Sequence, residues 1–230
     1  MTQPSARAVQ ELHPRLGRKK FHQVLSGYVL LFFLFSFYGW LLETAHFVIR
    51  WGKLTDRGFL SLPLCPIYGF SLLAAGLVLG SPRKGTLRPL FERAKRLRPA
   101  ARGAAYGGLL LLYYVFASAL PAGAELAVGA FCDKLLGIRL WDYSYKGNDL
   151  FGYITLDRTL VWGILLALVL TIAWEPLRET LCSFAPAAKR RADAFAAVLI
   201  ALTLIDYAFN LIWLAATGTH FILFVSRNFF

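Results

Sequence analysis

Five apolar runs, each long enough to cross a lipid bilayer, constrain this chain more than any other feature. A helix needs about 20 mostly apolar residues to cross about 30 Å of hydrocarbon. The runs cover residues 25–49, 59–80, 104–131, 153–174 and 194–216. Hydrophobic residues make up 57% of the chain, above the roughly 45–50% of soluble domains. The sequence therefore predicts an all-α, polytopic transmembrane helical bundle with about five spans in a lipid bilayer.

The positions of the positive charges predict the orientation. The 25 Lys and Arg residues give a net charge of +12 and lie in short stretches between the apolar runs. This distribution differs from the single basic face of a nucleic-acid-binding protein, so we expect no nucleic-acid partner. Alternate segments, beginning with the N-terminal tail, hold 17 of these residues, and the other segments hold 7. The positive-inside rule then places the N-terminus in the cytoplasm and the C-terminus outside.

These assignments predict one membrane domain with two long loops. Residues 1–24 would form a cytoplasmic tail and residues 25–230 a single transmembrane helical domain. Residues 81–103 would form a basic cytoplasmic loop, and residues 132–152 an outer loop.

Glu43 is a carboxylate inside the first apolar run. An ionisable side chain within a span costs about 2.5–3.5 kcal/mol on insertion scales, so it needs a reason. Helical spacing places His46 and Arg50 on the same face as Glu43. Glu43 either belongs to a structural network with Arg or backbone donors, or binds a proton or ligand. Glu43 and His46 match half of a di-iron motif, but no second copy exists, so no metal site is predicted.

Other apolar runs carry charges as well. Glu125 lies toward the outer end of the third run, and Arg158 near the start of the fourth. Asp206 stands near the expected bilayer midplane, in a polar stripe with Thr203 and Asn210. That stripe fits interhelical hydrogen bonding, and it also fits a translocation or proton path.

Two loops have unusual sequences for their expected depth. Pro63 and Pro66 interrupt the second apolar run, and non-helical backbone there must be buried in protein or line a wet cavity. Residues 139–152 are rich in Trp, Tyr and turn-forming residues, which suits an interfacial belt or the wall of a site.

In the five-span topology most of the charged residues within or beside the apolar runs gather at one membrane face. The candidate binding residues are Glu43, Arg57, Glu125, Asp142 and Arg158. The secondary polar sites are His46, Asp157, Asp206, Asn210 and Asn148.

Several motifs resemble those of a known family. Gly39-Trp-Leu-Leu-Glu-Thr44, Arg57-Gly-Phe-Leu60 and Cys65-Pro-Ile-Tyr-Gly69 resemble the opening signature of the bacterial ABC-transporter type IV (CmpB-type) family. Glu125, Trp141-Asp-Tyr-Ser144, Asn148, Gly152 and Trp162-Gly163 resemble its second signature, in the same order. Asp56, Ser61-Leu62 and Tyr153 depart from the family pattern. The resemblance implies a permease-like, multi-pass protein of the bacterial cytoplasmic (inner) membrane.

The chain has no loop able to bind ATP. The nearest match, between Gly80 and Thr86, contains a proline and has no Lys after its second Gly. A permease-like subunit would therefore need a separate ATPase subunit, docked on residues 83–102, or a second copy of itself. No cofactor is expected.

Two other functions remain open. One is a membrane-embedded enzyme acting on a lipid-type substrate, although no nucleophile–base spacing favours catalysis. The other is a structural or accessory membrane subunit whose buried charges specify assembly. Pairing between Cys65 and Cys132, which could both approach the outer face, also stays open.

Overall fold

The computed structural model describes residues 6–219 and 221–223, with side chains described from residue 24 onward. Its regular elements are seven helices and one two-stranded antiparallel hairpin. They are α1 (Ala6–Trp51), α2 (Pro66–Val78), α3 (Arg88–Lys95), α4 (Pro99–Leu136), β1 (Asp149–Leu150), β2 (Ile154–Thr155), α5 (Leu156–Ile172), α6 (Trp174–Cys182) and α7 (Pro186–Thr217). The predicted all-α helical fold is confirmed.

The number of spans differs from the predicted five. Three helical stretches among the described residues are long and apolar enough to cross a membrane: Val24–Trp51, Pro99–Leu136 and Pro186–Thr217. Helices α5 and α6, which are bent by 54° relative to each other, count as a fourth span only if the pair crosses the membrane as one unit. The predicted run 59–80 contains only α2, whose 13 residues extend about 20 Å, which is less than the hydrocarbon thickness. The count of five therefore holds only approximately.

Residues 52–65 are non-helical, as the two prolines predict. Gly52 has a φ of 61° and ends α1 with a hydrogen bond from its N–H to the Val48 carbonyl. Pro66 begins α2, because its missing N–H would have no helical partner at that position. The Cys65 N–H donates to the Ser36 carbonyl at 2.9 Å, so the segment has returned to the middle of the α1 span by that point. Residues 52–65 and α2 together therefore retrace most of the depth of that span.

Helices α1, α2, α4, α5 and α6 share one apolar core. Trp174, at the break between α5 and α6, is 2% exposed and packs with Leu31, Ala75 and Leu170. Gly76 allows this packing, because a Cβ there would lie 2.3 Å from the Trp174 ring. The bent pair and α2 are therefore locked together by a single large side chain.

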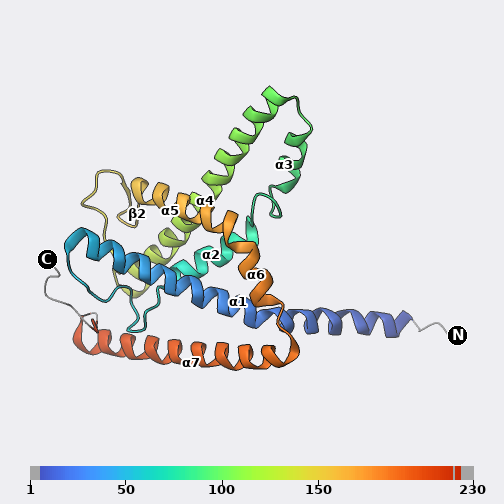
Figure 1. Cartoon of the computed structure of the whole chain (residues 1–230). Helices are drawn as coiled ribbons and strands as arrows, with labels where there is room; N and C mark the ends of the chain where they lie inside the picture. The colour runs from blue at the N-terminus through green and yellow to red at the C-terminus, as the bar shows by residue number, and fades with distance from the viewer. Residues whose placement is uncertain (1–5, 220, 224–230) are drawn as a thin grey trace.

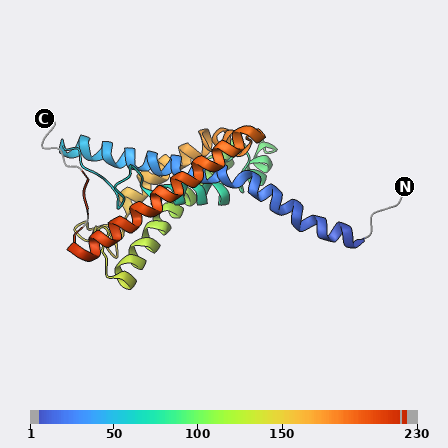
Figure 2. The ribbon, with the colours of Figure 1, turned by 90° about the horizontal axis from the view of Figure 1, so that it is seen from below.

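Helices α3 and α7 lie at the periphery of the bundle. Figure 1 shows α3 folded back along the start of α4, where the two project from the other helices. Phe91 and Tyr106 join them, with ring centroids 5.7 Å apart. Figure 2 shows α7 crossing over α1, and its Leu199 and Tyr207 pack on a small cluster that includes Leu60 of the non-helical segment. Helix α7 is thus attached through α1 and residues 52–65.

Candidate functional site

Glu43 lies at the centre of a polar group formed by three segments. Its carboxylate accepts a 2.5 Å hydrogen bond from the Tyr68 hydroxyl of α2. Arg57, from the non-helical segment, places Nη2 3.7 Å from Glu43 Oε2 and its guanidinium carbon 4.9 Å from the centre of the Phe47 ring. The Glu43 side chain is 19% exposed and that of Arg57 is 38% exposed. A largely buried carboxylate is therefore held by one neutral and one charged donor.

Glu125 of α4 lines a small cavity together with Tyr68, the residue that donates to Glu43. The cavity has a volume of about 80 Å³, enough for several water molecules or a group of similar size. Glu125 interacts electrostatically with Glu43 and with Arg158. The lining comes from α1, α2, α4 and α5 and consists of Leu42, Ile67, Tyr68, Ser71, Leu72, Pro121, Glu125, Trp162, Leu165, Leu166 and Val169. The cavity thus has one carboxylate in a mostly apolar lining, and Glu43 contacts that lining through Tyr68.

Arg158, in the first turn of α5, supplies the second positive charge. Its guanidinium carbon lies 5.0 Å from the centre of the Tyr143 ring. Burial raises the pKa of Tyr143 to about 12, so this residue stays a neutral phenol near neutral pH. The Nε atoms of Arg57 and Arg158 are buried without a hydrogen-bond partner among the described residues. We refer to Glu43, Arg57, Glu125 and Arg158 as the charged cluster.

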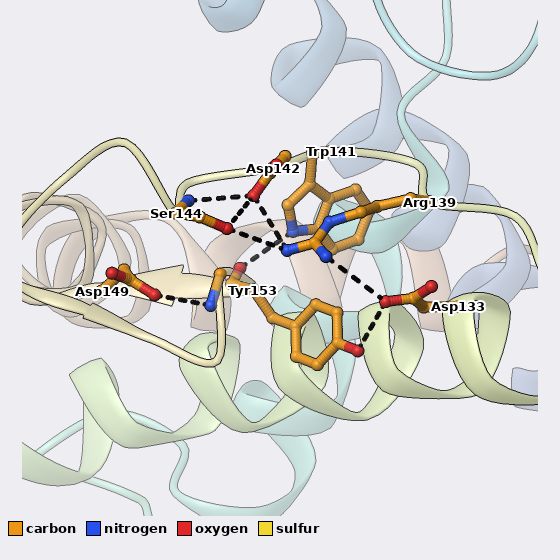
Figure 3. Close-up of polar contacts among 8 residues, drawn as sticks. Asp133, Arg139, Trp141, Asp142, Ser144, Asp149 and Tyr153 are labelled. Atoms are coloured by element: carbon orange, nitrogen blue, oxygen red, sulfur yellow. Dashed lines mark hydrogen bonds and ion pairs between the residues drawn. The ribbon is translucent and has the colours of Figure 1, made fainter.

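Asp142 lies outside the charged cluster, in the network that shapes the outer loop (Figure 3). Its Oδ1 atom accepts hydrogen bonds from the Ser144 hydroxyl, from the Ser144 N–H at 2.9 Å and from Arg139 Nη2 at 2.8 Å. The bonds from Ser144, and then the Arg139 charge, hold the pKa of Asp142 below its usual value. Asp142 therefore fixes a turn, as an aspartate can do in a loop.

The same network ties the loop to α4 and to the hairpin (Figure 3). Arg139 Nη1 lies 3.7 Å from Asp133 Oδ2, and the Tyr153 hydroxyl donates to that oxygen at 2.8 Å. Trp141 Nε1 donates to the Tyr153 carbonyl at 2.8 Å. These contacts hold the loop carrying Tyr143, and therefore the ring on which Arg158 stacks.

Asp157 and Asn148 are paired at the start of α5, separately from the charged cluster. Asp157 Oδ2 lies 2.6 Å from Lys146 Nζ, and Asn148 Nδ2 donates to Asp157 Oδ1 at 3.4 Å. Asp157 and Arg158 thus have different partners, as expected for neighbours that point in different directions. His46 and Arg50 are exposed on α1, with Arg50 placed 5.6 Å from the centre of the Trp51 ring.

Asp206 and Asn210 meet the non-helical segment at a second polar group. Asp206 Oδ2 accepts a 2.9 Å hydrogen bond from the Leu62 N–H. Asn210 Nδ2 donates to Asp206 Oδ1 at 3.0 Å and to Ser61 Oγ at 3.1 Å. The sequence left two functions open for this stripe, interhelical hydrogen bonding or a translocation path. In the structure its partners lie in the non-helical segment, where the Leu62 N–H has no helical acceptor and bonds Asp206 instead.

Three aromatic residues near the cavity and the charged cluster are not among the site residues predicted from the sequence: Tyr68, Tyr143 and Trp162. Tyr68 and Tyr143 belong to the motifs quoted for the family resemblance, and Trp162 begins the Trp-Gly pair. Their positions in those motifs were the available signal, because a neutral aromatic side chain in an apolar run does not stand out by charge. All three cysteines are free thiols in the structure, so Cys65 and Cys132 are not paired there.

Residues 30–211 match the family described as "Putative ABC-transporter type IV". This match covers well over half of the chain. The chain belongs to the ABC-transporter type IV family. The matched range contains every residue of the charged cluster, as well as Asp206 and Asn210. Comparisons with curated proteins and with solved structures give no match.

Proposed function

We propose that this protein is a permease-type subunit of the bacterial cytoplasmic membrane, and that the cavity beside its charged cluster binds the cationic group of a small solute. Membership of an ABC-transporter-type family and the long apolar helices support a membrane transport protein. The distribution of Lys and Arg favours an orientation in which the charged cluster lies toward the outer face.

The observation that carries the proposal is a carboxylate, Glu125, in the wall of a small cavity, with a second carboxylate, Glu43, bonded to the Tyr68 hydroxyl of the same wall. Glu43 and Glu125 come from different helices and interact electrostatically. Their negative charges favour a cation in the cavity, and the Trp162 ring in the cavity wall can add a cation–π contact. Carboxylates within membrane spans often mark binding sites for ions or substrates.

The two guanidiniums of the charged cluster fit the same function. Arg57 and Arg158 balance the two carboxylates, so the empty cavity does not keep an uncompensated charge. Their buried Nε donors have no partner among the described residues. Neither arginine lines the cavity, so a solute would have to extend beyond it to reach those donors with an anionic or carbonyl group. A zwitterionic or amino-carbonyl solute would suit the charged cluster in this way.

Energy for transport would come from another chain. Helix α3 and the start of α4 project from the bundle. Residues 88–102, which span this projection, contain six Lys and Arg residues. This basic arm suits docking of a separate ATPase subunit with an acidic surface, by charge complementarity. A second copy of the chain is the alternative partner.

Methylammonium binding tests the cavity directly. The purified full chain in detergent would be titrated with methylammonium chloride, with potassium chloride as the ionic-strength control, and followed by Trp fluorescence. We expect a saturable change that potassium chloride does not reproduce. Glu125→Gln and Glu43→Gln should each weaken binding about tenfold or more, because each removes a charge that faces the cation. Glu92→Gln, on the exposed surface of α3, is the matched control and should bind like the parent chain.

The outcome separates a binding site from a structural network. No methylammonium-specific change in the parent chain would refute the proposal, and so would unchanged binding in both cluster variants. If the parent chain does not bind and the two variants unfold at much lower temperature, the carboxylates serve assembly and the protein is a structural or accessory subunit. Tyr68→Phe keeps the shape of the wall and should weaken binding less than either Glu→Gln change.

A further inference from the structure

The second polar group contains a carboxylate, Asp206, that no ion pair among the described residues balances. Asp206 is residue 21 of the 32 in α7, near the middle of the apolar stretch that would lie in the bilayer. Among the described residues Asp206 accepts side-chain hydrogen bonds from two neutral donors, the Leu62 N–H and the Asn210 amide. The Lys and Arg ion pairs of the described chain do not include Asp206. Asp206 is partly buried, and a carboxylate at this depth in a membrane normally pairs with a cation. The described part of the chain supplies none.

The atoms around Asp206 include oxygens that no donor reaches. Asn210 is 1% exposed and Thr203 is 8% exposed. The Asn210 Oδ1 and Thr203 Oγ1 atoms are both buried without a hydrogen-bond partner among the described residues. Thr203, Asp206 and Asn210 share one face of α7 through their spacing of three and four residues. Ser61 Oγ joins them, 3.1 Å from Asn210 Nδ2.

The backbone opposite Asp206 is of the kind that binds hard cations. Residues 61–65 are non-helical. The Leu62 and Cys65 carbonyls accept from the Leu64 and Tyr68 N–H groups, so the other carbonyls of this segment are the candidate ligands. Interrupted helices in transporters use such carbonyls, together with side-chain oxygens, to hold Na⁺. Carboxylate, amide, hydroxyl and carbonyl oxygens are the ligands that hard cations prefer.

We infer that Asp206, Asn210, Thr203 and Ser61 form a Na⁺ site between α7 and the non-helical segment. Na⁺ supplies the missing positive charge and also satisfies the unpaired Asn210 and Thr203 oxygens. A proton on Asp206 would cancel the charge but would leave those oxygens without a partner. The site is separate from the charged cluster, and its existence does not depend on the proposed solute.

Bound Na⁺ would fasten two weakly attached elements. Helix α7 lies at the edge of the bundle and packs on α1 and on the cluster around Leu60. A cation coordinated from both sides would join α7 to residues 61–65, so Na⁺ should stabilise the folded chain and protect this segment. A ligand that binds only the folded state raises the unfolding temperature as its concentration rises.

Thermal unfolding of the full chain in detergent tests the site. The midpoint temperature Tm would be measured by intrinsic fluorescence at constant ionic strength while NaCl replaces choline chloride, with KCl in a parallel series. We expect Na⁺ to raise Tm saturably, by about 3–5 °C at a tenfold excess over its Kd, and K⁺ to raise it less. Amide hydrogen exchange of the peptide covering residues 59–65 should slow in Na⁺.

Matched variants assign the effect to this site. Thr203→Val keeps the side-chain shape and removes one oxygen, and we expect it to raise the Na⁺ midpoint concentration about tenfold. Asp206→Asn should abolish the Na⁺-dependent rise, whereas Asp193→Asn, the same change in the first turns of the same helix, should keep it. Neither Thr203→Val nor Asp206→Asn should alter methylammonium binding at the charged cluster.

Three results would overturn the inference. One is an equal Tm in Na⁺, K⁺ and choline for the parent chain. Another is a Na⁺-dependent rise that persists in Asp206→Asn and keeps its midpoint in Thr203→Val. The third is a Tm that depends on pH but not on Na⁺ and that loses its pH dependence in Asp206→Asn, which would assign a proton to Asp206. The first result needs only the parent chain, so it can be obtained even if a variant does not fold.

Discussion

The two halves of the bundle solve the same packing problem with different chemistry. Around Trp174 the helices meet through apolar side chains and closely approaching glycines, and the large aromatic side chain is almost fully buried. Around Glu43 the same helices meet through carboxylates, guanidiniums and phenols, and a cavity remains between them. The cavity borders the apolar core, because Leu72, Leu166 and Val169 belong to both, whereas the charged cluster lies around Glu43. We therefore expect the Trp174 region to contribute mainly to stability and the Glu43 region mainly to binding.

The largest expected effect comes from adding one methyl group to the packed half. Gly76→Ala would place a Cβ 2.3 Å from the buried Trp174 ring, and the ring has little room to move. We expect a loss of about 2–3 kcal/mol in the free energy of unfolding, measured as a lower Tm in detergent. Gly108→Ala is the control: nothing lies within 4 Å of its Cβ position. There alanine should be neutral or stabilising by about 0.5–1 kcal/mol. Equal effects at the two positions would contradict the assignment of stability to the Trp174 half.

A smaller and local effect is expected in the outer loop. Gly152 has a φ of 72°, and a Cβ there would lie 2.2 Å from Arg139 Nη2. Gly152→Ala should displace Arg139 and loosen residues 137–155, with a cost of about 1–3 kcal/mol confined to this loop. Hydrogen exchange in the loop should rise, while the Tm of the helices changes little. Gly147→Ala has nothing within 4 Å and should leave exchange unchanged; a large drop in Tm for Gly152→Ala would show that the two halves are coupled.

The smallest effect is expected from an exposed ion pair. Lys84 Nζ lies 2.6 Å from Glu179 Oε1, and both side chains are more than half exposed. Water and salt screen such a pair, so Lys84→Ala should change Tm by less than about 1 °C. A clear decrease that disappears at high salt would mean that surface charge contributes to stability beyond the apolar core.

The sequence was a better guide to element type than to the course of the second run. Hydropathy located three spans closely, because lipid-facing helices must be apolar over a fixed length. It also read 59–80 as a span, since apolar composition alone cannot distinguish a straight helix from irregular backbone followed by a short one. Pro63 and Pro66 marked the break, but not its extent down to the level of Ser36. The 54° bend at Trp174 also has a proline beside it, Pro176, which removes the hydrogen bond to the Ile172 carbonyl where α5 ends. The proline marks a break, but neither its angle nor its partners.

The sequence by itself determined that this chain is a helical membrane protein, which residues carry charge inside it, and that Glu43 must have partners. These conclusions follow from the cost of exposing polar groups to lipid, which acts on each segment separately. The tertiary structure alone decided that Tyr68 and Arg57 hold Glu43, that Asp142 shapes a loop outside the charged cluster, and that Asp206 faces the Leu62 backbone. Those pairings depend on how segments distant in the sequence pack against each other, and no single helix encodes that packing.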